Sequence, residues 1–206
     1  MSIKLNPSET ALVLIEYQNE FTTEGGLLHD AVKECMEKTN MLENSSSLMN
    51  DLRSKGVQIM HVPIAFGPGH SEIGASAGIL AGIKEGKTFQ KGTSAVEFHP
   101  SMAPDVSKGD MIVDGKLGLC SFFSTNLDFR LRQKGIKNVI IGGFLTNCCV
   151  ESTMRTAYEH GYSVYTLKDC TAATSMEAHN GAIDSDFGLF STVSTANEMK
   201  AAISAE

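Results

Sequence analysis

Two adjacent cysteines, Cys148 and Cys149, stand where an apolar run turns into a helical pattern, in the segment GGFLTNCCVESTMRTA (142–157). A thiol in the first turn of a helix faces the positive end of the helix dipole, which lowers the pKa of the thiol and activates it as a nucleophile. Free backbone N–H groups in that turn can also hold the negative oxygen of an acyl-transfer intermediate. The same residues fit a purely structural role, in which two small apolar side chains dock a helix. Spacing alone does not choose between the two cysteines.

A lysine and a glutamate elsewhere in the chain are suited to serve such a thiol. Lys116 ends a short apolar run in DGKLG. An ammonium beside a thiolate lowers the pKa of the thiol and stabilises negative charge on a substrate, although a solvated loop position equally fits a lone lysine. Glu16 interrupts the apolar run ALVLIEY (11–17). A carboxylate at the end of a buried strand needs a partner, either in catalysis or in a structural salt bridge.

These candidate residues follow short apolar runs that are typical of strands buried on both faces. Helical patterns separate the runs, and such alternation predicts a parallel sheet with helices on both sides. We therefore expect a three-layer α-β-α fold with a mainly parallel central sheet, in a single domain over residues 1–206. In such sheets ligands bind beyond the carboxyl ends of the strands, where Glu16, Lys116 and Cys149 all fall. The expected strands are 11–17, 57–62, 111–113, 138–143, 163–167 and 192–194.

Helical spacing of apolar residues predicts the segments between these strands. Leu28 to Met49 predicts one long amphipathic helix that ends near Gly56. Thr146 is the expected N-cap of the helix that carries the two cysteines. Residues 64–110 are rich in Gly, Pro and Ser and lack clear periodicity, which is typical of binding loops or lids. The other expected helices are 124–133, 147–160, 176–190 and 196–203.

Composition excludes several classes of protein. The net charge is −7 and the basic residues are scattered, which argues against a nucleic-acid partner. No apolar run reaches the roughly 20 residues that a membrane-spanning helix needs, and MSIKLNPSET lacks the layout of a secretory signal, so we expect a cytoplasmic protein without a membrane partner. The chain has five cysteines, an odd number, and we expect a reducing compartment. Both points argue against a disulfide framework.

Three longer segments resemble the isochorismatase-like cysteine hydrolases, the superfamily that includes nicotinamidase and N-carbamoylsarcosine amidase. LIEYQNEF (14–21) is similar to a strand that ends in D-x-Q-x-x-F, and DGKLGLCSFFSTNL (114–127) is similar to the segment with the family's lysine. GFLTNCCVESTMRTAYEHGYSVYTLKDC (143–170) is similar to G-x-x-T-x-x-C-V-x-x-T and the strand after it. The resemblance covers nearly the whole chain and implies the same Rossmann-like α/β fold.

The resemblance implies roles for individual residues. It implies Cys149, rather than its neighbour, as the nucleophile, Lys116 as the catalytic lysine, and Glu16 at the position of the family's catalytic aspartate. Glutamate keeps the carboxylate but adds a methylene group, and an error of roughly 1 Å at a reacting centre costs about 10²-fold in rate. The family's non-proline cis peptide would fall at Phe144–Leu145, where it would aim the N–H groups of Leu145 and Cys149 at the oxyanion.

The resemblance also bears on metals and pocket residues. Zinc-binding members of the family carry D-x-H and a later histidine after the second strand, but Ala65 and Gly67 take the first two of these positions here and leave His70 alone. One histidine cannot hold zinc, so we expect no metal, and the absence of G-x-G-x-x-G predicts no dinucleotide cofactor. The candidate substrate-binding residues are Phe21, Phe66 and Phe122.

A cysteine in this setting favours attack on an amide-like carbonyl. The leading hypothesis is therefore hydrolysis of a small C–N substrate through a thioester at Cys149. Two alternatives stay open: a catalytically weak member that acts in binding or redox sensing, and a vinyl-ether hydrolase related to isochorismatase, which would not need the cysteine. The expected partners are a small-molecule substrate and, by the resemblance, further copies of the chain in a dimer or tetramer.

Overall fold

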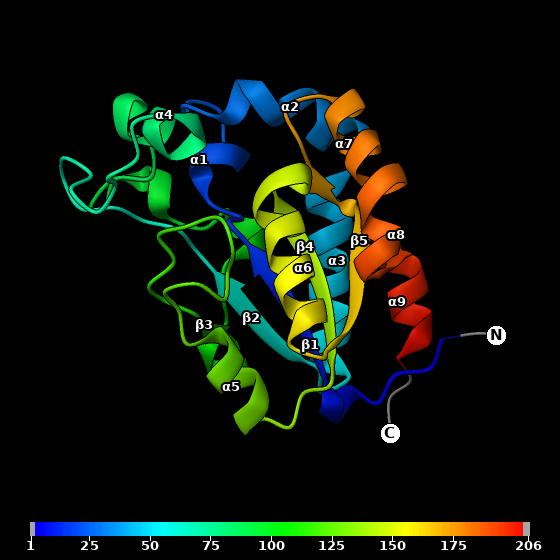
Figure 1. Cartoon of the computed structure of the whole chain (residues 1–206). Helices are drawn as coiled ribbons and strands as arrows, with labels where there is room; N and C mark the ends of the chain where they lie inside the picture. Colours follow the sequence, from blue (N-terminus) through cyan, green and yellow to red (C-terminus); the bar gives the residue numbers. More distant parts are fainter. Residues whose placement is uncertain (1–2, 204–206) are drawn as a thin grey trace.

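A computed structural model describes residues 3–203, and a parallel sheet lies at its centre (Figure 1). Within these residues the sheet has six strands in the order β3-β2-β1-β4-β5-β6, and every neighbouring pair is parallel. The predicted parallel α/β fold is confirmed. The strands are β1 (Thr10–Ile15), β2 (Gln58–Val62), β3 (Met111–Ile112), β4 (Asn138–Phe144), β5 (Ser163–Ala172) and β6 (Thr192–Ser194).

Both faces of the sheet are buried, as the continuous apolar runs predicted. Every residue of β1 is buried. Because side chains alternate between the two faces of a strand, Leu12 and Leu14 pack into one hydrophobic cluster, whereas Ala11, Val13 and Ile15 pack into another. Each cluster needs its own layer of helices to complete it, which gives the three-layer arrangement.

The helices divide between these two faces (Figure 1). Apolar residues of α2, α3 and α9 pack with the Leu12 side of the sheet, and those of α5 and α6 pack with the Val13 side. Helix α7 contributes Met176 to the first cluster and Ala182 to the second. The helix bounds are α1 (Asn19–Thr22), α2 (His29–Lys38), α3 (Met41–Ser54), α4 (Gly78–Gly86), α5 (Leu127–Gln133), α6 (Glu151–Glu159), α7 (Met176–Ala182), α8 (Gly188–Phe190) and α9 (Ala196–Ala202). Short 3₁₀ segments are η1 (Pro7–Glu9), η2 (Ser94–Val96), η3 (Pro100–Met102) and η4 (Val106–Lys108), and π-helical turns are η5 (Thr146–Val150) and η6 (Ile183–Phe187).

Two of the expected segments are wrong in detail. The single long helix predicted up to Gly56 is two helices, because Asn40 adopts a left-handed conformation with φ 52° between α2 and α3. Asparagine tolerates this conformation better than most residues, and it breaks the helical hydrogen-bond ladder. The segment 64–110, expected to be irregular, contains the helix α4.

The order of the strands creates a switch point between β1 and β4. The chain builds outward from β1 through β2 to β3, returns to β4 on the other side of β1, and builds outward again to β6. Connections that leave two neighbouring strands in opposite directions open a crevice at their carboxyl ends, which is where such folds bind ligands. The residues that follow β1 and β4 therefore face a common space. Over residues 3–203, none of the helices combines the length and apolarity needed to cross a membrane.

Candidate active site

Glu16 is the first residue after β1, and its backbone is unusual. It adopts φ 59°, a left-handed conformation that glutamate rarely takes, while its N–H donates to the Val62 carbonyl oxygen at 3.1 Å. A non-glycine residue in this region costs of the order of 1 kcal/mol or more and is found mainly where the surroundings demand it, often at functional sites. The turn places a carboxylate that is only 2% exposed at the carboxyl edge of the sheet.

Lys116 meets Glu16 from the loop after β3. A parallel bridge with Ile64 holds its backbone, and its side chain is buried. The Lys116 Nζ atom donates to Glu16 Oε1 at 2.5 Å and to the Gly118 carbonyl oxygen at 2.6 Å. Burial disfavours the charge on Lys116, but Glu16, with Cys149 adding to it, outweighs burial and raises the pKa of Lys116 above its ordinary value. The ammonium is therefore charged at neutral pH.

Two glycines, Gly142 and Gly143, lie near the end of β4, just before the segment that carries Cys149. Gly143 has φ 137°, and a Cβ atom there would lie 2.1 Å from the Ile15 carbonyl oxygen, so only glycine fits beside β1. The peptide bond Phe144–Leu145 is cis, at the position that the family resemblance implied. The N–H groups of Cys148 and Val150 then both donate to the Leu145 carbonyl oxygen, at 3.0 and 3.2 Å, in a π-helical turn. This turn places Cys149 at the start of the helical segment that leads into α6.

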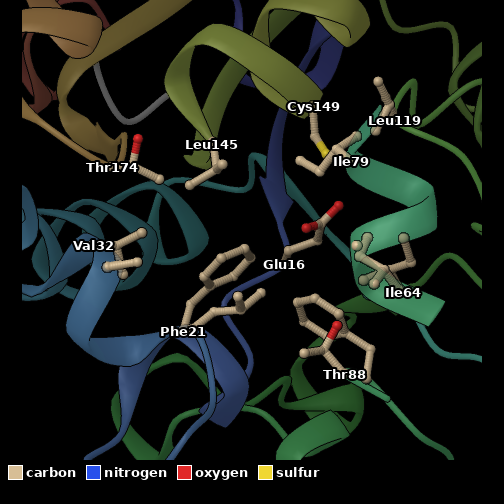
Figure 2. Close-up of a pocket in the computed structure, with 15 residues that line it drawn as sticks. Glu16, Phe21, Val32, Ile64, Ile79, Thr88, Leu119, Leu145, Cys149 and Thr174 are labelled. Carbon is tan, nitrogen blue, oxygen red and sulfur yellow. The ribbon is translucent and has the colours of Figure 1, made fainter. Parts of the chain in front are cut away.

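The thiol of Cys149 is protonated at rest, contrary to the expected effect of the helix dipole. Its interaction with the Cys148 thiol, its burial and the Glu16 carboxylate raise the pKa of Cys149 well above its ordinary value, and Lys116 opposes the rise without cancelling it. The Glu16 carboxylate and the Cys149 sulfur point toward one another (Figure 2). Such a site needs a base to form the thiolate, and Glu16 is a carboxylate in the right place to be that base.

A cavity of about 340 Å³ lies beside these two residues (Figure 2). Its walls come from α1, α2, α4, the loop after β2 and the turn after β4, so the segment 64–110, predicted to contain a binding loop or lid, forms one side of it. Glu16 and Cys149 both line the cavity. Its apolar walls include Phe21, Val32, Ile64, Ile83, Phe89 and Leu145.

Of the three phenylalanines predicted to bind substrate, only Phe21 lines this cavity. Phe66 is fully buried and stacks on His70, while its backbone bonds to the strand-like segment at Phe89. Phe122 stacks on His160 and Tyr162. Both rings complete packing outside the cavity.

Thr146 does not cap its helix. Its hydroxyl is 2.8 Å from Nδ1 of the buried His179 on α7, and Leu145, which has no capping side chain, occupies the N-cap position. Burial lowers the pKa of His179, which makes the ring neutral at pH 7. Thr146 and His179 thereby tie the turn that carries Cys149 to the neighbouring helix, a contact between residues 33 positions apart that local spacing cannot reveal.

Two further polar residues that the sequence left without a role brace the cavity wall. Gln18 donates from Nε2 to the carbonyl oxygens of Ile64 and Val96, both at 2.9 Å, and accepts the Ile64 N–H at 2.9 Å. The buried Glu20 carboxylate accepts the N–H groups of Leu27 and Phe89, both at 2.8 Å. The sequence feature that could have identified both residues is a polar side chain in an otherwise buried segment. Such a side chain must find hydrogen-bond partners.

His70, the residue left from the family's zinc motif, is buried away from the cavity. Its Nε2 atom lies 2.7 Å from the Thr88 carbonyl oxygen, and its ring stacks on Phe66. In the described part of the chain, 3–203, no three histidine, cysteine, aspartate or glutamate side chains are grouped so that they could hold a metal ion. His70 thereby joins the loop after β2 to Thr88, which lines the cavity.

The fold and site together define a class of protein: a doubly wound parallel α/β protein with a carboxylate, an ammonium and a thiol at the carboxyl edge of its sheet. The family model described as Isochorismatase domain matches residues 10–198, so the chain belongs to the isochorismatase family of hydrolases.

Individual relatives agree with this assignment. The chain is 32% identical over 181 residues to the ureidoacrylate amidohydrolase RutB of Agrobacterium fabrum, covering 82% of this chain and 78% of the relative. A cysteine hydrolase structure from Pseudomonas syringae pv. phaseolicola superposes with a TM-score of 0.85 at 24% identity, covering 97% of this chain and 94% of that one. An N-carbamoylsarcosine amidase structure from Thermoplasma acidophilum superposes with a TM-score of 0.72 at 24% identity, covering 92% and 97%. The two structures establish the shared fold.

Proposed function

We propose that the chain hydrolyses the C–N bond of a small amide or ureide through a thioester at Cys149. The observation that carries the proposal is the meeting of the Glu16 carboxylate and the Cys149 thiol at one cavity, with Lys116 bound to the carboxylate at 2.5 Å. The names of relatives, ureidoacrylate amidohydrolase and N-carbamoylsarcosine amidase, support C–N hydrolysis as the reaction type.

In the first half-reaction Glu16 accepts the proton of the Cys149 thiol, and the sulfur attacks the carbonyl carbon of the substrate. The backbone N–H groups of Leu145 and Cys149 are the proposed donors to the resulting oxyanion. Glu16 then returns the proton to the nitrogen as the C–N bond breaks, and an amine or ammonia leaves. Because the resting thiol is protonated, the base has a proton to carry to the leaving group.

In the second half-reaction water replaces the amine. Glu16 accepts a proton from water, and the hydroxyl oxygen attacks the thioester carbonyl carbon. The C–S bond breaks, the acid leaves, and the thiolate of Cys149 regains the proton from Glu16. Lys116 keeps its charge throughout and stabilises each anionic state of the pair, which is consistent with its raised pKa.

Glutamate in place of the family's aspartate fits this mechanism. The longer side chain reaches Lys116 at 2.5 Å, and the left-handed backbone at Glu16 sets the direction in which it leaves the strand. The side chain therefore keeps direct contact with Lys116 despite its additional methylene group. This supports an active base over a residue kept only for binding or redox sensing.

A pair of cysteine variants tests the proposal. We expect Cys149→Ala to stop ammonia release from a panel of small primary amides and ureides and to stop formation of an acyl adduct detected by intact-protein mass spectrometry. Cys148→Ala is the matched control, and we expect it to keep both. Hydrolysis that survives Cys149→Ala would refute the thioester route and favour chemistry that does not need the thiol, such as vinyl-ether hydrolysis.

A further inference from the structure

The cavity beside Cys149 has walls that suit an uncharged group. Within the described chain it is lined by 15 residues, and none of them is lysine, arginine or histidine. Apart from Glu16 and Cys149, the polar side chains that line it are those of Thr88 and Thr174. Thr174 is exposed, whereas Thr88 is only 4% exposed. An apolar cavity that lacks a counter-ion strongly disfavours a charged guest.

The Lys116 ammonium already has hydrogen-bond partners within the protein. Lys116 does not line the cavity, and its Nζ atom donates to Glu16 Oε1 at 2.5 Å and to the Gly118 carbonyl oxygen at 2.6 Å. A substrate carboxylate in the cavity would therefore face the Glu16 carboxylate without a free cation to balance it. The cavity should therefore bind anionic ureides poorly, including ureides of the kind for which the ureidoacrylate amidohydrolases are named.

Thr88 lies on the side of the cavity away from Cys149 (Figure 2). Its N–H donates to the Ile83 carbonyl oxygen at 3.1 Å, and its carbonyl oxygen lies 2.7 Å from His70 Nε2. Its hydroxyl is enclosed by protein atoms and is not accessible from the cavity. Thr88 therefore adds no accessible hydrogen-bonding group to this wall.

We propose that this cavity selects compact, neutral, apolar amides. The volume of about 340 Å³ agrees, because it lies at the lower end of the range for ligand pockets, roughly 300–1,000 Å³. This inference rests on the proposed function for the site, since it takes the amide carbonyl to lie at Cys149.

Binding and turnover are measured separately to test it. The probes are benzamide, its 3- and 4-hydroxy derivatives, and 4-carbamoylbenzoate, which differs from benzamide by one carboxylate. Calorimetric titration of Cys149→Ala should show at least about 100-fold tighter binding of benzamide than of 4-carbamoylbenzoate. Equal or tighter binding of the anion, or failure of every neutral probe to bind, would overturn the inference.

Ammonia release by the unmodified enzyme separates the two proposals. If the neutral amides bind but release no ammonia, the proposed function fails and the selectivity stands. If 4-carbamoylbenzoate is hydrolysed in preference to benzamide, amide hydrolysis stands and the selectivity is overturned.

Discussion

Replacing Glu16 with glutamine keeps the size of the side chain and removes its charge, so it isolates what the carboxylate does. The Lys116 side chain is fully buried and bonded to Glu16 Oε1 at 2.5 Å. Removing one partner of a buried ion pair leaves the other charge uncompensated, at a cost of about 3–5 kcal/mol. We therefore expect Glu16→Gln to lower the free energy of unfolding by about this amount at pH 7, measured by urea denaturation.

A surface pair of the same length provides the control. Lys137 Nζ and Glu9 Oε1 are also 2.5 Å apart, but their side chains are 68% and 37% exposed. Exposed pairs contribute about 0–1 kcal/mol, so Glu9→Gln should lower the free energy of unfolding by no more than that. Equal losses of stability in the two variants would refute the view that burial makes removal of a Glu16–Lys116 partner more costly than removal of a surface one.

The stability loss should depend on pH with a definite sign. In the native protein the pKa of Lys116 is raised, because Glu16 outweighs the opposing effect of burial. Without Glu16, burial should hold the pKa of folded Lys116 below its unfolded value of about 10.4. The unfolded variant then binds more protons than the folded one, so its stability rises as pH increases toward that value. The difference in free energy of unfolding between the variant and the unmodified protein should therefore decrease from pH 7 toward about pH 10.

The same variant should change the chemistry of Cys149 in two opposite ways. Because the Glu16 carboxylate contributes to the raised pKa of Cys149, its removal should lower the pH at which iodoacetamide labels half of the Cys149 thiol. Loss of the proposed base should lower amide turnover by about 10²–10⁴-fold at pH 7. Labelling is followed by peptide mass spectrometry in a Cys148→Ser background. An unchanged or higher labelling midpoint would refute the electrostatic reasoning.

Three other substitutions test how the fold supports the site. Gln18→Leu removes three hydrogen bonds at 2.9 Å to the cavity wall and should lower stability by about 3 kcal/mol in urea melts; a loss under 1 kcal/mol would contradict this. Gly143→Ala should yield no soluble folded protein, as judged by circular dichroism, because its Cβ would meet a carbonyl oxygen at 2.1 Å. Burial opposes the charge on Asp110, but His61 and Arg53 outweigh it and hold the pKa of Asp110 well below its ordinary value, so stability should fall as pH drops below about 4. Asp110→Asn should be less stable at pH 7 and should lose less between pH 5 and about 2.

Local patterns in the sequence predicted much of the fold. Buried strands of a parallel sheet must be apolar on both faces, so runs such as 138–143 were visible without knowledge of their neighbours. A carboxylate inside such a run, as at Glu16, had to have a partner, and the structure supplies Lys116. The helix predicted through Asn40 was wrong because one left-handed residue breaks a helix without disturbing the apolar spacing on either side.

The sequence by itself determined the class of fold, the strand ends at which chemistry is placed, and the family resemblance that pointed to Cys149. Only the tertiary structure decided that Thr146 bonds to His179, that Phe66 and Phe122 pack outside the cavity, and that α4 forms one of its walls. The physical reason is the range of the interactions. Strand and helix patterns repeat over a few neighbouring residues, whereas a side chain's partner and the walls of a cavity depend on segments brought together only by folding.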